Sequence, residues 1–428
     1  MPEDAPPTRF RFTPEDRWLA GICLARVGFV MIYTAYAAAQ PLLMVDWGLS
    51  ASEAGWIHST WHLGFLVSLF AVGFLADRYG AKRVYLLSSF GAAAGAVLFA
   101  VFARDFVSAF VLYGLTALFS GGSYTPVLTI ISQQIASARR GRAVGYYIAA
   151  SSAGSALSLF LSGLMLEVAG WRGAFAVAAA GPVAGLAMAF WFLRRTPNVV
   201  PEPAGPAGDG GMVQAVFRNR PAMLNIWGYT WHSWELLGMR AWIATFLAAV
   251  IGTGIAGSTH AASQGAAFAA VMYAVAMGGN IAGGSLSDRW GRTEVILLMS
   301  CLSLLCSLTL GWLAAGPFWL VLAVGIFYNF TAIADSPVLS TQITELVPPR
   351  HLGAAYSVRS VLGFGTGVVS PWLFGVVVDW GRETTGALGP FTWGMAFISL
   401  ALGGLLGPLG TLWQWRLRQR PGAAGERA

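Results

Sequence analysis

Long apolar stretches separated by short polar segments dominate the chain. Most hold about 20 or more residues with few charges, the length that an α-helix needs to cross the hydrocarbon core of a bilayer. We predict twelve such helices, with ends defined to a few residues. In the first half they cover about 18–40, 54–76, 84–103, 106–134, 143–166 and 172–193. In the second half they cover about 222–251, 263–286, 294–314, 318–346, 352–378 and 389–413.

Three segments lack this apolar pattern. The segment between the halves is rich in proline and glycine, which predicts a flexible, non-spanning linker. Within it, Val213, Val216 and Phe217 are compatible with either a short interfacial helix or a coil. The predicted organisation is an N-terminal tail (1–17), a six-helix bundle (18–193), the linker (194–221), a second six-helix bundle (222–413) and a basic C-terminal tail (414–428).

Composition and charge support an integral membrane protein. The chain is 56% hydrophobic and 11% charged, whereas a soluble domain would carry about 25% charged residues. With this topology, about 20 of the 26 Lys and Arg residues fall on one side of the membrane. This positive-inside pattern predicts a multi-pass protein of a bacterial-type inner (plasma) membrane, with both termini cytoplasmic. The same distribution argues against nucleic-acid binding, despite the net charge of +7.

The sequence shows no sign of a bound cofactor or of catalytic machinery. Cys23, Cys301 and Cys306 all lie in apolar stretches, and we see neither a metal-ligand cluster nor a phosphate-binding glycine loop for a nucleotide. His58 and His62 have the i, i+4 spacing of a metal pair, but no third ligand is visible, so a pH-sensitive gate or polar packing is favoured. We therefore expect no cofactor, no metal and no enzyme activity.

One short motif follows an apolar stretch in each half, 211 residues apart. The first copy contains Gly73, Asp77, Arg78, Gly80, Lys82 and Arg83. The second contains Gly284, Asp288, Arg289, Gly291 and Arg292. At the same offset, Thr125-Pro126 matches Ser336-Pro337. Two similar halves in so apolar a chain predict a transporter built from parallel repeats.

The doubled motif resembles the loop-2/3 and loop-8/9 signatures of the major facilitator superfamily (MFS). The resemblance covers about 18–413 and implies two pseudo-symmetric bundles around a central cavity, working by alternating access as a monomer. Glycines permit tight turns and close helix approach. We expect Asp77 to meet the N-terminal end of span 11, and Asp288 that of span 5, when the cytoplasmic side closes. Arg78, Lys82 and Arg83 can pair with acids or lipid phosphates and so help to hold that side closed. The alternative is a loop whose charges only set the orientation.

Five charged residues lie inside predicted spans, where each costs about 2.5–3.5 kcal/mol on insertion scales. They are Arg26, Glu235, Arg240, Asp335 and Arg359. The residues at the repeat-equivalent positions are uncharged, so the scaffold does not require these charges. The resemblance implies that spans 1, 4, 7 and 10 line the cavity, which makes four of the five candidate lining residues.

Three interpretations of these charges remain open: structural pairs, substrate recognition and proton coupling. An arginine fork binds carboxylate or phosphate well, whereas coupling suits only the acids. The substrate-binding candidates are Arg26, Tyr33, Tyr36, Gln40, Arg240, Arg359, Tyr328 and Thr331, and the proton-coupling candidates are Asp335 and then Glu235. We expect Asp335 to pair with Arg359 or Arg240. Arg26 either faces the cavity or snorkels to the cytoplasmic surface.

The function that we predict is secondary active transport of a small organic solute, driven by a proton gradient, with a preference for an organic anion. That preference follows from three intramembrane arginines against two acids. The alternative is efflux of amphipathic, drug-like compounds. Members of the family that this chain resembles often carry a proton-linked arginine early in span 4, and many drug–proton antiporters carry a Gly-Pro motif in span 5. Both features are absent here, which weakens the alternative. A membrane receptor or a membrane-embedded enzyme is a remote alternative. The expected partners are the substrate, protons and membrane lipids.

Overall fold

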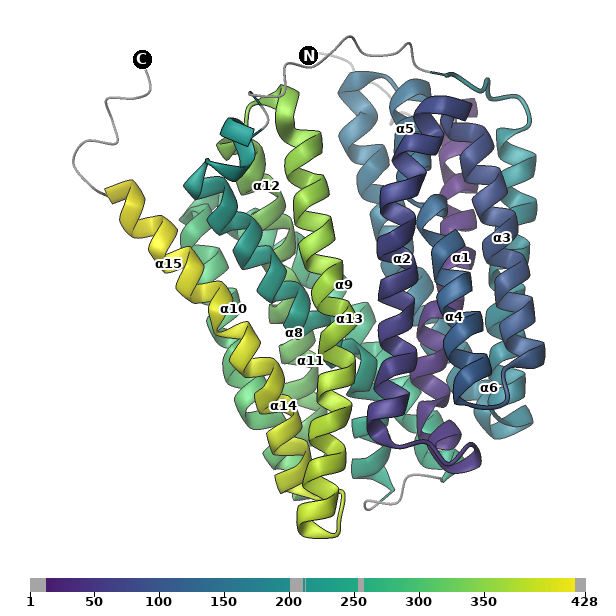
Figure 1. Ribbon diagram of the computed structural model, residues 1–428, viewed down its shortest axis with the longest axis vertical. Coiled ribbons are helices and arrows are strands. Elements are labelled where there is room, and N and C mark those ends of the chain that lie inside the picture. The colour runs from purple at the N-terminus through teal and green to yellow at the C-terminus, as the bar shows by residue number, and fades with distance from the viewer. Residues whose placement is uncertain (1–12, 201–210, 212, 253–257, 420–428) are drawn as a thin grey trace, which may run out of the picture.

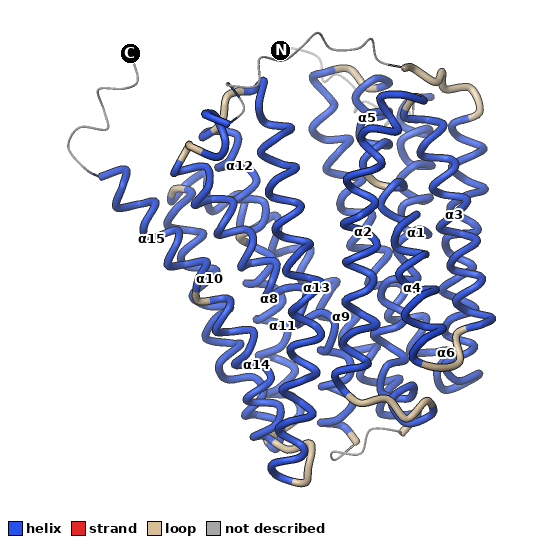
Figure 2. Tube along the Cα trace, viewed as in Figure 1, coloured by secondary structure: helices blue, strands red, loops and turns tan. Residues whose placement is uncertain are grey.

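The structure is a computed structural model that describes residues 13–200, 211, 213–252 and 258–419. Within these ranges the chain is helical and contains no β-strand (Figure 2). The first half contains α1 (Pro14–Asp46), α2 (Ala51–Tyr79), α3 (Ala81–Phe102), α4 (Phe106–Ser120), η1 (Gly121–Ser123), α5 (Thr125–Gln134) and α6 (Ser137–Leu193). The second half contains η2 (Val213–Phe217), α8 (Arg220–Ile251), α9 (Thr259–Trp290), α10 (Arg292–Thr309), η3 (Leu310–Ala315), α11 (Phe318–Ala334), α12 (Ser336–Leu346), η4 (Pro349–His351), α13 (Leu352–Thr385), α14 (Pro390–Gly404) and α15 (Leu406–Gln419).

The described residues form eleven helical segments that are long and apolar enough to cross a membrane. The longest, Arg139–Leu193, has 55 residues and contains Gly170, whose φ of 63° and ψ of −166° are not helical. Gly170 falls in the gap that the sequence predicts between 143–166 and 172–193, and it divides this segment into two spans. The prediction of an all-α membrane protein with twelve spans is confirmed.

Two spans are interrupted at equivalent positions of the repeat. α5 begins after Tyr124, and α12 begins after Asp335. In both, a proline (Pro126 or Pro337) occupies the first turn of the new helix. Proline has no N–H to donate inside a helix but fits its first turn, so the repeated Thr-Pro and Ser-Pro pairs explain both interruptions. Asp335 therefore lies at a helix break in the middle of a span.

The two halves of the chain lie side by side (Figure 1). Within the first half α1 packs on α6, and within the second α13 packs on α8 and α14. The halves meet where α2 runs along α13 and α6 runs along α9. We call the end of the molecule that carries Pro14 and Gln419 the tail side. The opposite end, with the loops at 47–50, 103–105 and 386–389, is the far side.

On the far side, α2 and α13 approach each other closely. A Cβ atom on Gly55 would lie 2.4 Å from the carbonyl oxygen of Pro371. One on Gly375 would lie 2.2 Å from the carbonyl oxygen of Ala51. Both distances are too short for any side chain, so glycine allows the two backbones to touch at these positions.

The described parts of the linker are attached to both halves. At its start, Asn198 accepts a hydrogen bond from the backbone N–H of Arg83 (3.1 Å) and donates one to the carbonyl oxygen of Tyr79 (2.9 Å). The Nζ of Lys82 donates to the carbonyl oxygen of Thr196 at 2.7 Å. The linker is thereby fixed to the loop that carries the first motif.

Residues 213–217 of the linker and residues 414–419 after the last predicted span are helical in the structure. Residues Val213–Phe217, for which a short helix or a coil was open, form one helical turn with Val216 buried against α8 and α12. The last helix continues past the predicted end at 413 to Gln419. Gln414 is buried there because its Nε2 donates to the carbonyl oxygen of Pro221 at 2.8 Å.

Candidate functional site

Arg26 of α1 is held by polar and aromatic groups of its own half. Its Nε donates to the Oγ of Ser151 at 2.7 Å, and its guanidinium carbon lies 4.9 Å from the ring centroid of Tyr124 and 5.6 Å from that of Tyr147. The residue is 9% exposed. Of the two possibilities that the sequence left open for Arg26, snorkelling to the surface is wrong, because the side chain turns inward against α5 and α6.

Arg359 of α13 is held in a similar way in the second half. It donates to the Oγ of Ser340 at 2.7 Å and stacks over Tyr229 and Tyr356, with its guanidinium carbon 4.0 and 4.8 Å from the ring centroids. The side chain is half-buried and lies on α13, which packs along α2 of the first half. Arg359 therefore lies where the two halves face each other.

Arg240 of α8 also reaches the space between the halves. Its guanidinium carbon lies 4.6 Å from the ring centroid of Tyr273 in α9, and α8 contacts α1 of the first half. Among the described residues, neither Arg240 nor Arg359 has a carboxylate within 4.0 Å. The Nε atoms of both are buried without a hydrogen-bond partner in the part of the chain that the structure covers. Two arginines in the membrane interior are thus left with their charge uncompensated by protein.

Asp335 pairs with a histidine rather than with an arginine. Its Oδ1 lies 2.8 Å from the Nδ1 of His232 in α8, and both side chains are buried. The expected pairing of Asp335 with Arg359 or Arg240 is wrong in this structure. The helix break before α12 directs the carboxylate toward α8, and the guanidinium of Arg359 is already bound to Ser340. An acid and a titratable base are therefore in direct contact inside the second half.

Glu235 points into the second bundle and away from the space between the halves. Its Oε2 accepts a hydrogen bond from the Oγ of Ser303 in α10 at 3.1 Å. Nearby, the hydroxyl of Tyr328 in α11 donates to the Oγ of Ser307 at 3.0 Å. The hydroxyl of Thr331 bonds to a carbonyl oxygen of its own helix and is also buried. Tyr328 and Thr331, predicted to bind substrate, are packed inside the bundle in this conformation.

Of Tyr33, Tyr36 and Gln40, the remaining first-half candidates, Tyr33 alone is half-buried, and it lies on α1, which contacts α8 of the second half. Tyr36 is fully buried, and its hydroxyl donates to the carbonyl oxygen of Ala54 at 3.2 Å. The Oε1 of Gln40 lies 2.8 Å from the Nε2 of His58, so both residues join α1 to α2. The structure thus places Tyr33, Arg240 and Arg359 where the halves face each other, whereas Arg26 is enclosed within the first half and Asp335 within the second. It places Tyr36, Gln40, Glu235, Tyr328 and Thr331 inside the bundles.

The first motif is exposed on the tail side. Gly80 has a φ of +87°, a backbone conformation that favours glycine, and it joins α2 to α3. Gly73 faces open space, since a Cβ added there would have no atom within 4 Å, so it does not serve close helix packing here. Asp77 is exposed, and we find no polar partner for it among the described residues, while Arg78 lies over the ring of Tyr79. The expected contact of Asp77 with the start of α13 is not formed in this conformation.

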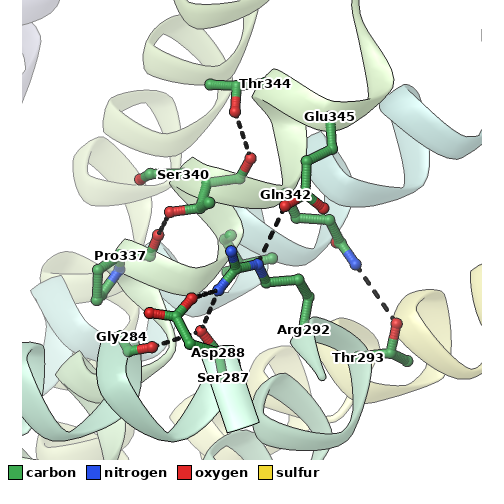
Figure 3. Close-up of polar contacts among 12 residues, drawn as sticks. Gly284, Ser287, Asp288, Arg292, Thr293, Pro337, Ser340, Gln342, Thr344 and Glu345 are labelled. Atoms are coloured by element: carbon green, nitrogen blue, oxygen red, sulfur yellow. Dashed lines mark hydrogen bonds and ion pairs between the residues drawn. The ribbon is translucent and has the colours of Figure 1, made fainter. Parts of the chain in front are cut away.

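The second motif is tied to its own half (Figure 3). The guanidinium of Arg292 donates to Asp288 (2.5 Å), Ser287 (2.7 Å) and Glu345 of α12 (3.2 Å). Gly291 has a φ of +99° and forms the same turn as Gly80. Gly284 faces open space and Arg289 is exposed. The expected contact of Asp288 with span 5 is absent here because Arg292 holds the carboxylate within the second half.

The far side carries a contact between the halves that our sequence analysis missed. The two carboxylate oxygens of Asp379 in α13 accept hydrogen bonds from the backbone N–H groups of Ala51 and Ser52, each at 2.8 Å. These are the first residues of α2, so the carboxylate binds the positive end of a helix. Asp379 lies one residue past the predicted end of span 11, and its sequence gives no signal that distinguishes it from an ordinary loop charge.

The halves are joined on the far side, and a cavity borders both of them toward the tail side. Besides Asp379, His260 of α9 contacts Glu167 of α6 on the far side, with 2.5 Å between Nδ1 and Oε1. Toward the tail side, a cavity of about 630 Å³ is lined mainly by α1 and α6 of the first half, including Arg142 and Tyr146, and reaches Met277 of α9. The exposed state of both motifs agrees with this opening.

Comparison with known proteins identifies one family across the chain. A sequence model of the Major Facilitator Superfamily matches residues 22–357 and, in a second match, 236–428. Among solved structures, a bacterial homologue of the human lysosomal transporter Spinster, in an inward-facing and unoccupied conformation, superposes with a TM-score of 0.77. That superposition covers 98% of this chain and 100% of the other at 16% sequence identity, which shows a shared fold.

Curated relatives are transporters and resistance proteins. The chain is 26% identical over 189 residues to the gallate transporter of Pseudomonas putida, covering 44% of this chain and 40% of that protein. It is 30% identical over 210 residues to the puromycin resistance protein pur8 of Streptomyces alboniger (47% and 41%). Both matches span less than half of the relative. A longer match, 24% identical over 378 residues, is to the probable sulfoacetate transporter SauU of Cupriavidus necator (82% and 85%).

Proposed function

The chain belongs to the Major Facilitator Superfamily, and from this premise we propose that it carries a small organic anion across the membrane by alternating access. Membership of this family makes it a membrane transporter of small molecules, not an enzyme. The anionic nature of the substrate, the coupling to protons and the direction of transport are parts of the proposal. Their support comes from the placement of the intramembrane charges.

The observation that carries the proposal is the pair of uncompensated arginines, Arg240 and Arg359. A charged side chain inside a membrane is costly unless another charge or a hydrated cavity accommodates it. Both guanidinium groups lie between the halves and are held by aromatic rings, without a carboxylate partner among the described residues. Their donor groups match the two oxygens of a carboxylate, sulfonate or phosphate. A bound anion would supply the missing negative charge.

Two of the relatives support an acidic substrate. Their names specify gallate and sulfoacetate, both of which are organic acids, and the sulfoacetate transporter aligns with most of this chain. Each of these substrates carries at least one planar or tetrahedral anionic group. The same chemical class fits the arginines that this chain presents between its halves.

We assign proton coupling to the contact between Asp335 and His232. The two groups are buried and 2.8 Å apart between Nδ1 and Oδ1, so a change of protonation in either one alters the charge of the pair. The pair lies at the break between α11 and α12, and Ser340 of α12 accepts the hydrogen bond from Arg359. Glu235, inside the same bundle, is the second candidate because one of its oxygens is buried without a partner in the described chain.

We assign the tail side to the cytoplasm, in a bacterial-type inner membrane. With the topology that the sequence predicts, about 20 of the 26 Lys and Arg residues fall on that side, in agreement with the positive-inside rule. With this orientation, the open cavity near Arg142 and the closed contact at Asp379 correspond to an inward-open state. Closure of the cytoplasmic side would bring Asp77 into contact with the second half and Asp288 into contact with the first half. The proposed transporter works as a monomer.

Efflux of amphipathic compounds is the second candidate function, favoured by the 30% identity to the puromycin resistance protein. The aromatic rings of Tyr33, Tyr229 and Tyr273 around the arginines would suit such compounds. Against this function, a cationic drug would meet uncompensated guanidinium groups in the same space. The two functions therefore predict opposite charge preferences for the ligand.

Thermal stabilisation of the purified protein by a ligand panel distinguishes the two functions. A ligand that binds only the folded protein raises the free energy of unfolding with the logarithm of its concentration, by about 2.7 kcal/mol at 100 times Kd, and so raises the midpoint of thermal unfolding. We expect stabilisation by aromatic and aliphatic carboxylates or sulfonates, and loss of that stabilisation in Arg240→Ala and Arg359→Ala. Arg382→Ala, which removes an exposed arginine on the far side, is the matched control. Unchanged anion binding in both arginine variants would disprove the proposal.

A further inference from the structure

A second, separate cavity lies at the tail-side end of the first half. It has a volume of about 470 Å³ and is formed by the start of α1, the end of α5 and the end of α6 with the residues that follow it. Its lining combines three arginines with two tryptophans, namely Arg17, Arg194, Arg195, Trp18 and Trp191. The transport proposal does not use any of these residues.

The charge of this cavity is positive and not balanced by protein. Arg17, Arg194 and Arg195 are exposed, and none forms an ion pair among the described residues. The acid in the lining is Glu15, whose Oε2 forms an ion pair with the Nη1 of Arg139 at 3.2 Å. Arg194 stacks over the indole of Trp191, and its guanidinium carbon lies 3.7 Å from the ring centroid. Three guanidinium groups are therefore available to one anionic ligand.

The cavity opens at the depth of lipid headgroups. Leu193 ends the membrane-spanning helix α6, and the arginines follow directly after it. One turn back on the same helix, Phe190 and Trp191 are 66% and 58% exposed, as expected for side chains that contact acyl chains and the interface. A ligand in the cavity therefore has charged groups on its tail side. Toward the far side it meets an apolar, outward-facing helix surface.

We propose that this cavity binds the phosphate headgroup of an anionic phospholipid, with its acyl chains along the exposed face of α6. Basic pockets at the ends of membrane helices match such headgroups in charge and in hydrogen bonding. The apolar surface formed by Phe190 and Trp191 favours a lipid over a free phosphate, which has no acyl chains to place there. The cavity lies outside the space between the halves and is distinct from the proposed substrate site.

The bound lipid would also act on the first motif. Thr196 lines the cavity, its hydroxyl accepts a hydrogen bond from the Nε1 of Trp18 at 3.3 Å, and its carbonyl oxygen accepts one from Lys82 at 2.7 Å. Asn198 continues this connection to the backbone of Arg83. A headgroup that holds Arg195 in place therefore stabilises the linker segment on the loop of the first motif.

The test compares lipids in delipidated, detergent-purified protein. The unfolding midpoint is measured with phosphatidylglycerol, with phosphatidylcholine of the same acyl chains, and with inorganic phosphate. We expect phosphatidylglycerol to raise the midpoint more than the other two. Arg17→Gln/Arg195→Gln should bind phosphatidylglycerol about thirty-fold more weakly, which corresponds to about 2 kcal/mol at about 1 kcal/mol per arginine near an anionic surface.

Two further variants make the result specific. Arg104→Gln/Arg382→Gln removes the same charge from two exposed arginines on the far side and should leave the lipid preference intact. Arg17→Lys/Arg195→Lys should keep most of the preference, because the charge is conserved. Equal stabilisation by the two lipids, or retention of the preference in the Gln variant, overturns the proposal. Stabilisation by inorganic phosphate equal to that by phosphatidylglycerol overturns the assignment to a lipid.

Discussion

The contact of Asp379 with the start of α2 makes a direct prediction about the equilibrium between the two transport states. The carboxylate accepts two hydrogen bonds of 2.8 Å from backbone N–H groups and joins the halves on the far side. When the far side opens, α2 and α13 separate and these bonds break. Asp379→Asn removes the negative charge and leaves one carbonyl oxygen as the acceptor. The variant should therefore favour the far-side-open state.

The size of this shift can be worked out from the interactions that are lost. A hydrogen bond to a charged group contributes about 1.5–3 kcal/mol, and an anion at a helix N-terminus about 0.3–1 kcal/mol. Because asparagine keeps one hydrogen bond, we expect a net loss of about 1–2 kcal/mol. That corresponds to a shift of about 5- to 30-fold in the equilibrium between the two states. Asp379→Arg places a cation against the same N–H groups and should shift the equilibrium further in the same direction.

Distances between spin labels on the far side measure this equilibrium. Labels at Arg104 and Ala315, both exposed on the far side, report on the two halves in a background without Cys23, Cys301 and Cys306. The long-distance population should grow in Asp379→Asn and again in Asp379→Arg. Glu383→Gln removes an exposed acid one turn further along α13 and is the matched control. If both Asp379 variants give the distance distribution of Glu383→Gln, the contact does not contribute to closure.

Two other predictions follow from the same geometry. Asp335→Asn should retain substrate exchange but lose uphill accumulation driven by a pH gradient, because the neutral amide cannot change charge with His232; unchanged accumulation in proteoliposomes would exclude this role. Gly80→Ala should lower the free energy of unfolding by about 1–3 kcal/mol, since alanine is strained at a φ of +87° and its Cβ would meet Asn198 at 2.3 Å. Gly73→Ala, where the added Cβ meets open space, should change the unfolding midpoint little and is the control.

The succession of helices was predictable from the sequence because it follows from local properties. Apolar length gives the spans, and proline and glycine mark their interruptions. The repeated Ser/Thr-Pro pairs coincide with the starts of α5 and α12, and Gly170 divides the longest helix in the predicted gap. Gly80 and Gly291 occupy equivalent turns with positive φ, which explains why both copies of the motif keep a glycine there.

The partners of the intramembrane charges were not predictable, because they depend on how each helix is rotated against its neighbours. Glu235 and His232 are one turn apart on α8, yet one contacts Ser303 inside the bundle and the other contacts Asp335. Opposite charge alone suggested that Asp335 would pair with an arginine. The contact at Asp379 was also hidden, since it requires the end of span 11 to lie beside the start of span 2.

The separation of acids from arginines is the strongest link between this structure and the proposed substrate. Asp335 is paired with His232, and Glu235 is directed into the second bundle. Neither acid is placed to neutralise Arg240 or Arg359 in the described structure. In a medium of low dielectric constant, two guanidinium groups that lack protein anions attract a mobile anion and repel a mobile cation. A substrate that brings negative charge lowers the free energy of this arrangement, whereas a cationic substrate raises it, so the same residues that favour anion transport disfavour efflux of cationic drugs.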